Sequence, residues 1–129
     1  MPIVTALYAG LLGLLAVAVA FPAGMLRGKL NISVGDGGNP ALLLAMRRHA
    51  NFAEWVPLAL ILIALLELNG VSTRAIHSLG AALVIARLLH AIGLKSDTLQ
   101  SVGRGVGAMA TALITVTASV WLLVVFVQR

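Results

Sequence analysis

The chain has 129 residues, of which 60% are hydrophobic and only 10% are charged. Soluble domains contain about 45–50% apolar and about 25% charged residues, so this composition, gathered in long apolar blocks, predicts an all-α integral membrane protein. The absence of cysteine excludes disulfides, thiolate metal sites and a cysteine nucleophile. The formal net charge is +5. Because no basic stripe lies outside the apolar blocks, no nucleic-acid partner is expected.

Four apolar blocks are long enough to cross a bilayer, which takes about 20 helical residues. Their expected bounds are about 3–25, 40–68, 73–94 and 102–127, with a short connection over 95–101. No basic residue precedes the first block, so we expect it to remain in the mature protein and not to be removed as a signal peptide. Residues 1–129 are expected to form one four-helix transmembrane domain.

Proline and glycine mark where these helices should start, bend and end. Pro40 suits the first turn of the second helix. Pro22 is expected to kink the first helix, and Pro57 to bend the second, because proline lacks the amide that would bind the carbonyl four residues earlier. Gly70 is expected to end the second helix. Small residues that should let the fourth helix approach a neighbour closely are Gly103, Gly105 and Gly107.

The distribution of basic residues predicts the orientation in the membrane. Four spans place both termini on one side and the 1–2 and 3–4 connections on the other. Only Arg74 and Arg129 lie towards the side of the termini. The basic residues in or near the two connections are Arg27, Lys29, Arg47, Arg48, Arg87, Lys95 and Arg104. Because basic loops stay in the cytoplasm, both connections are expected inside and both termini outside.

The second block is unusual because polar residues occupy its first half. Arg47, Asn51 and Glu54 follow the spacing i, i+4, i+7, so they share one face of a helix. A cation, an amide and an anion therefore line up on one side of a helix that enters a membrane. Ionisable groups in such a position are costly and are candidates for a functional site.

Other polar residues should meet this face at the same end of the bundle. They are Arg27 or Lys29 at the end of the first block, Arg87 and His90 in the third, and Arg104 in the first turn of the fourth. Arginine binds carboxylates bidentately and keeps its charge. A basic pocket with the single carboxylate of Glu54 therefore suits a small ligand that bears several carboxylates and one ammonium group. An arginine close to a thiol also favours the nucleophilic thiolate.

The pattern Arg47-x-x-x-Asn51-x-x-Glu54-Trp55-x-Pro57 resembles the second-helix signature of the MAPEG family, the membrane-associated proteins of eicosanoid and glutathione metabolism. Residues 86–90, Ala-Arg-Leu-Leu-His, resemble the third-helix motif of that family. The four-span plan and the length match along nearly the whole sequence. Residues 35–38 and 49–54 are similar to the bacterial branch of the family.

The resemblance implies a homotrimer of four-helix protomers that binds glutathione between neighbouring protomers near the cytoplasmic face. Arg104 matches the fourth-helix arginine that activates the thiol, so it is the candidate catalytic residue. Trp55, His90 and Leu94 stand where leukotriene-forming members have tyrosines, so no specific eicosanoid substrate is expected. The candidate glutathione-binding residues are Arg27, Arg47, His49, Asn51, Glu54, Trp55, Arg87 and His90.

The expected function is that of a glutathione transferase or peroxidase in the bacterial inner membrane. Its substrates would be lipophilic electrophiles or lipid hydroperoxides, which would enter from the bilayer between the first and fourth helices. The alternative is a non-catalytic membrane scaffold that binds glutathione or lipid. A small transporter is a third hypothesis. The position of the charged residues argues against it, because they lie near one face of the membrane and not at its midplane.

Purely structural interpretations compete with these assignments. The polar face of the second helix could be a network that joins helices, because buried polar groups in membranes pair with each other. His49 and His90 with Glu54 would make a possible metal set, but the surrounding arginines would repel a cation, so no metal is expected. Arg48 is expected to be a solvated or headgroup-facing charge. The side chains expected simply to reach the interface at the side of the termini are Glu67, Arg74 and His77.

Overall fold

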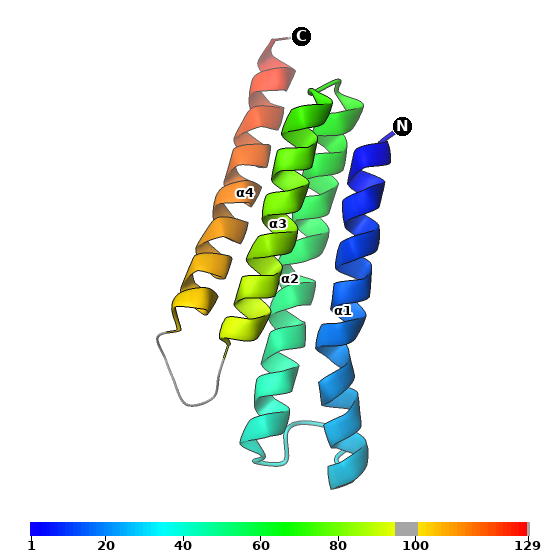
Figure 1. Ribbon diagram of the computed structural model, residues 1–129, viewed down its shortest axis with the longest axis vertical. Coiled ribbons are helices and arrows are strands. Elements are labelled where there is room, and N and C mark those ends of the chain that lie inside the picture. Colours follow the sequence, from blue (N-terminus) through cyan, green and yellow to red (C-terminus); the bar gives the residue numbers. More distant parts are fainter. Residues whose placement is uncertain (95–100, 129) are drawn as a thin grey trace.

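The computed structural model describes residues 1–94 and 101–128. Its four helices are α1 (Ile3–Leu30), α2 (Pro40–Leu68), α3 (Thr73–Gly93) and α4 (Val102–Val127). The described residues contain no strand, which confirms the predicted all-α class. The helices run along the long axis of the molecule (Figure 1). We call the end with both termini the terminal end, and the opposite end, with residues 31–39, the loop end. Of the predicted 3–4 connection, residues 95–100 lie outside the described residues.

The two central helices hold the bundle together. α2 and α3 contact each other, and each also packs against both α1 and α4. Within the described residues, α1 and α4 do not contact each other, and they lie on opposite sides of α2 and α3 in Figure 1. The expected path for an apolar molecule between the first and fourth helices is therefore not present within one protomer.

α1 is longer than the sequence predicted, because residues after Met25 are held by contacts that no hydropathy pattern shows. Asn31 ends the helix in the left-handed conformation, with φ of 53°, and the amide of Ile32 donates to the carbonyl of Arg27 over 3.1 Å. The guanidinium of Arg27 donates to the carbonyl oxygens of Ile32 and Ser33, at 3.3 and 2.9 Å. These bonds supply partners at the helix end, where carbonyls otherwise lack them.

The prolines from Pro22 onwards lie within the helices, and Gly70 follows the end of α2. Pro22 and Pro57 lie inside α1 and α2, and both helices continue past them. Pro40 occupies the first turn of α2, as predicted. Gly70 follows the end of α2 with a φ of 80°, a conformation that favours glycine, and its amide donates to the carbonyl of Glu67. The predicted end of the second helix is therefore confirmed.

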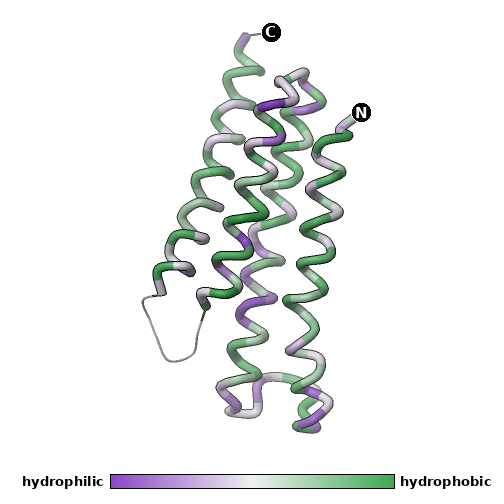
Figure 2. The backbone as a smooth tube through the Cα atoms, viewed as in Figure 1, coloured by the Kyte–Doolittle hydropathy of each residue, from purple (hydrophilic) through white to green (hydrophobic). Residues whose placement is uncertain are grey.

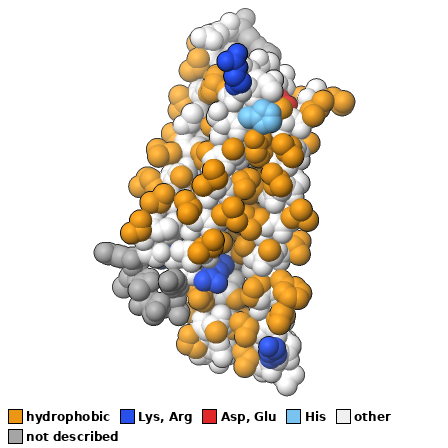
Figure 3. Space-filling view, in the orientation of Figure 1, with side chains coloured by type: hydrophobic (Ala, Val, Ile, Leu, Met, Phe, Trp, Pro, Cys, Tyr) orange, Lys and Arg blue, Asp and Glu red, His pale blue; other side chains and the backbone are white. Residues whose placement is uncertain are grey.

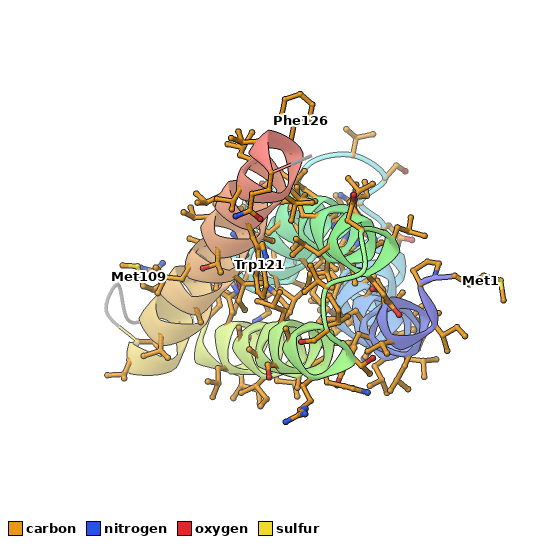
Figure 4. All side chains as sticks on the ribbon, turned by 90° about the horizontal axis from the view of Figure 1, so that it is seen from above. Met1, Met109, Trp121 and Phe126 are labelled. Atoms are coloured by element: carbon orange, nitrogen blue, oxygen red, sulfur yellow. The ribbon has the colours of Figure 1, made fainter. Side chains whose placement is uncertain are left out.

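Hydrophobic side chains fill the core and also cover most of the outer surface. Figures 2 and 3 show that apolar residues dominate the middle of the bundle on the face in view. Met1, Met109 and Phe126 extend away from the helices (Figure 4) and are 97%, 63% and 77% exposed. Each helix is long and apolar enough to span a membrane. Core residues include Leu12, Phe52, Val56, Ala59, Ile63, Leu83 and Ile114.

Glycines bring α3 and α4 into close contact near the loop end. A Cβ atom added to Gly107 would lie only 2.6 Å from the amide nitrogen of His90. One added to Gly103 would lie 3.2 Å from the carbonyl oxygen of Leu89, and one added to Gly93 would collide with the backbone of Gly103. The predicted close approach of the fourth helix is therefore confirmed at Gly103 and Gly107, whereas Gly105 has open space beside it.

Polar contacts at the terminal end correct the expectation of simple interfacial side chains. The carboxylate of Glu67 accepts hydrogen bonds from the amides of Val4 and Thr5, both at 2.8 Å, and from the Thr5 hydroxyl at 2.6 Å. A carboxylate there satisfies the unpaired amides of the first turn of α1. His77 Nδ1 lies 2.9 Å from the hydroxyl of Tyr8. Glu67 and His77 therefore join α1 to α2 and α3.

Candidate functional site

A cavity of about 550 Å³ lies between α2, α3 and α4 near the loop end. It contains four of the residues that the sequence singled out, Arg47, Asn51, His90 and Arg104, contributed by three helices. The described residues that line it are Pro40, Leu43, Leu44, Arg47, Asn51, His90, Leu94, Arg104, Gly105 and Ala108. One side is therefore polar and basic, and the remainder is apolar.

The wall from α2 is fixed by the way this helix begins. The side-chain oxygen of Asn39 accepts hydrogen bonds from the amides of Ala41 and Leu42, both at 3.0 Å, and Pro40 lies in the first turn. From Pro40 to Asn51 the helix advances eleven residues, or about 16 Å at about 1.5 Å per residue. The lining residues of α2 recur on successive turns over this length, so the cavity is elongated along the helix.

The opposite wall depends on the close contact of α3 and α4. His90 packs against Gly107, where any larger side chain would displace it. The imidazole is only 4% exposed, and its Nδ1 atom is buried without a hydrogen-bond partner among the described residues. A buried polar atom without a partner costs free energy. His90 therefore lines the cavity but carries an Nδ1 atom that no described residue satisfies and that is itself not exposed to the cavity.

Arg87 lies behind the cavity and does not line it. Its side chain is 1% exposed. One guanidinium nitrogen donates to Asn51 Oδ1 over 2.7 Å and another to the Thr111 hydroxyl over 3.4 Å, while the guanidinium lies 5.7 Å from the centre of the Phe52 ring. Its Nε atom has no partner among the described residues. The third-helix arginine therefore contacts a lining residue and not the cavity itself.

The described lining of this cavity is positively charged. Among the lining residues that the structure describes, Arg47 and Arg104 are charged and none carries a carboxylate. Among the described residues, Arg87 contacts an amide, a hydroxyl and an aromatic ring, and no carboxylate. Charges in the low-dielectric surroundings of a membrane interact strongly. An anionic ligand is therefore the natural complement of the site.

Other predicted site residues lie elsewhere in the protomer. Arg27 binds the connection after α1, and its other nitrogen lies 3.3 Å from the Met46 sulfur. Glu54 and Trp55 are exposed on α2 and do not line the cavity. His49 lines a second, apolar cavity of about 320 Å³ between α1 and α2, beside Ala53 and Pro57. Thus one protomer brings together only part of the predicted set.

Sequence reasoning missed three supporting residues. Arg48 was expected to be solvated, which is wrong, because its guanidinium donates twice to the carbonyl of Leu94, once over 3.0 Å, and so ties α2 to the end of α3. Thr111 and Phe52 surround Arg87 from α4 and α2. The two arginines contact residues 46 and 24 positions away along the chain, and no local pattern marks such pairs.

With the geometry described, comparison with known proteins identifies the family. The sequence model of the MAPEG family matches residues 5–124. The chain belongs to the MAPEG family. It is 35% identical over 119 residues to the inner membrane protein YecN of Escherichia coli strain K12, covering 92% of this chain and 91% of that protein. The protein of the same name from E. coli O6:H1 strain CFT073 matches equally. No solved structure is significantly similar to this MAPEG chain.

Proposed function

We propose that this MAPEG protein binds glutathione in the cavity between α2, α3 and α4 and uses its thiolate to conjugate lipophilic electrophiles or to reduce lipid hydroperoxides. The observation that carries the proposal is the convergence of Arg47, Asn51, His90 and Arg104 in one elongated cavity, with no carboxylate among the described residues that line it. Glutathione is an extended tripeptide with two carboxylates, and its net charge is negative. Family membership and the positive cavity both support this ligand.

The proposed division of labour follows from the chemistry of each group. Arg47 would bind a carboxylate of glutathione through its guanidinium fork. Arg104 would lie beside the sulfur and favour the thiolate, which is the nucleophilic form. The chain has a single tyrosine, Tyr8, and it contacts His77 at the terminal end. Activation of the thiol by a phenol is therefore not part of the proposal, and this task is assigned to Arg104.

Two reactions are compatible with a bound thiolate. In conjugation, the sulfur attacks an electrophilic carbon, a carbon–sulfur bond forms, and a leaving group departs with its electron pair. In peroxide reduction, the sulfur attacks an oxygen of the hydroperoxide, the oxygen–oxygen bond breaks, and an alcohol and a sulfenic acid form. A second glutathione then condenses with the sulfenic acid and releases water. The apolar substrate would reach the sulfur from the bilayer.

The remaining candidate residues are proposed to act across protomers of a homotrimer. Arg27, His49, Glu54 and Trp55 lie outside the cavity of their own protomer, so they would contact glutathione only from or beside a neighbouring copy. We place the protein in the bacterial inner membrane, where its relative is named, with the loop end in the cytoplasm and both termini outside. Cytoplasmic glutathione would then reach the cavity directly.

Titration calorimetry on detergent-purified protein tests the binding step. Arg47→Ala should weaken glutathione binding about tenfold or more, because it removes a charge-assisted contact. Arg74→Ala is the matched control, since this exposed arginine lies at the terminal end and should leave affinity unchanged. Loss of affinity in Glu54→Ala would support completion of the site by a neighbouring protomer. No binding to wild type at millimolar glutathione would contradict the proposal.

The alternative function is a non-catalytic scaffold that binds glutathione or lipid. The lack of a tyrosine in the cavity lining favours this alternative, because Leu94 offers no group for proton transfer. Saturable glutathione binding without product, across electrophiles such as 1-chloro-2,4-dinitrobenzene and cumene hydroperoxide, would favour the scaffold over the enzyme.

A further inference from the structure

Asn51 is held in one orientation by a partner that lies outside the cavity. Its side-chain oxygen accepts a 2.7 Å hydrogen bond from the Arg87 guanidinium. A guanidinium has only donors, whereas an amide has an oxygen that accepts and a nitrogen that donates. Only the oxygen of Asn51 can therefore face Arg87, and the amide nitrogen must point away from it.

The amide nitrogen of Asn51 is available to a ligand. Asn51 lines the cavity, and its nitrogen makes no hydrogen bond with the part of the chain that the structure describes. Rotation of the amide by 180° would place donors against donors at Arg87 and leave two buried groups unsatisfied. The orientation of Asn51 is therefore determined by Arg87, independently of any ligand.

Arg87 is itself fixed in place. It is the most deeply buried charged residue among those described, at 1% exposure. The Thr111 hydroxyl and the Phe52 ring lie on other sides of its guanidinium, and Thr111 in turn donates to the carbonyl of Gly107 over 2.8 Å. The three helices that form the cavity thus hold the group that orients Asn51.

We propose that Arg87 is a positioning residue that fixes Asn51 as a hydrogen-bond donor towards the cavity. The ligand must then place a carboxylate or carbonyl oxygen, and not an ammonium group, against Asn51. This inference rests on the proposed function in taking glutathione as the ligand. It adds the orientation of the bound glutathione, since the ammonium group of glutathione must lie away from Asn51.

A double-mutant cycle measured by glutathione calorimetry tests whether Arg87 acts through Asn51. Asn51→Ala and Arg87→Met should each weaken binding about tenfold, the effect of one hydrogen bond to a charged group. The double variant should be weakened about tenfold as well, because the second change removes a contact that the first has already lost. Additive loss of about a hundredfold would overturn the inference while leaving the proposed function intact.

A second variant keeps the test decisive should Arg87→Met not fold. Asn51→Asp preserves the shape of the side chain and can pair with Arg87, but it turns an acceptor towards the cavity. We expect glutathione affinity to fall about a hundredfold or more, through repulsion between carboxylates, without loss of the folded protein in size-exclusion chromatography. Binding within threefold of wild type would overturn the inference.

Two further variants separate positioning from loss of charge. Arg87→Lys retains a donor-only group and should keep more affinity than Arg87→Met. Arg74→Met makes the same substitution at the terminal end and should bind as wild type does. Equal losses in Arg87→Lys and Arg87→Met would count against the inference. Wild type that binds no glutathione would overturn both the inference and the proposed function, whereas wild-type binding with an additive cycle would overturn the inference alone.

Discussion

The two ends of this bundle use similar polar residues in opposite ways. At the terminal end, the Glu67 carboxylate accepts three hydrogen bonds and His77 contacts Tyr8. At the loop end, His90 Nδ1 has no partner among the described residues, and the amide nitrogen of Asn51 faces a cavity. Polar groups in membranes are costly at either end. Groups that satisfy each other stabilise the fold, whereas the amide of Asn51, which lines the cavity, is available to a ligand.

The largest expected effect belongs to the open end. Arg104→Ala should lower the conjugation rate constant about a hundredfold or more, by analogy with the loss of one transition-state contact, while glutathione still binds. Stopped-flow assays with 1-chloro-2,4-dinitrobenzene, combined with calorimetry, measure the two effects separately. Retained turnover would remove Arg104 from the mechanism and weaken the assignment of the loop end as the functional end.

The second largest effect should lower both the folding stability and the ligand affinity. Gly107→Ala adds a Cβ atom 2.6 Å from the amide of His90, so it should cost about 1–3 kcal/mol through overpacking and also weaken ligand binding. Unfolding in mixed detergent micelles measures the stability. Gly10→Ala is the control, because a Cβ atom there meets nothing within 4 Å. Equal stability of the two variants would contradict the close α3–α4 contact.

A smaller effect, confined to stability, is expected at the closed end. Glu67→Gln replaces three charge-assisted hydrogen bonds at the start of α1 with weaker neutral ones, which should cost about 1–2 kcal/mol. Glutathione affinity should not change, because Glu67 lies at the opposite end of α2 from the cavity. A Glu67→Gln variant with normal stability but impaired glutathione binding would contradict the assignment of the terminal end to stability and the loop end to ligand binding.

The smallest effect should come from a single hydroxyl group. Tyr8→Phe keeps the ring that packs against Gly80 but removes the hydrogen bond to His77. The expected cost is about 0.5–1.5 kcal/mol, measured by the same unfolding assay. Conjugation activity should be that of wild type, and a loss of activity would mean that a residue of the terminal end acts in the reaction.

The helices were predictable because their signals are local. Long apolar blocks, Pro40 and Gly70 marked α2 correctly, since a membrane helix must satisfy its own backbone. The end of α1 was misplaced by five residues, from 25 to 30, because Arg27 continues the helix through contacts with Ile32 and Ser33 that hydropathy does not register.

The cavity was predictable only in part. Helical spacing placed Arg47 and Asn51 on one face, and both line the cavity with His90 and Arg104. Spacing did not reveal that Glu54, on the same stretch of α2, is exposed outside it. Nor did it reveal that Arg87 binds Asn51 from behind, because such contacts depend on how one helix is rotated against another. The roles of these residues towards glutathione stay predictions.

In the described part of the chain α1 and α4 do not contact each other, and this has a consequence for how the chain assembles. The chain divides into two antiparallel hairpins, α1–α2 and α3–α4, which meet where α2 packs against α4, α1 against α3 and α2 against α3. Each hairpin can enter the membrane as a unit in the order of synthesis. The cavity comes into being only when the second hairpin docks on the first, because α2 supplies one wall and α3 and α4 supply the other. Ligand affinity would therefore report that the two halves have joined.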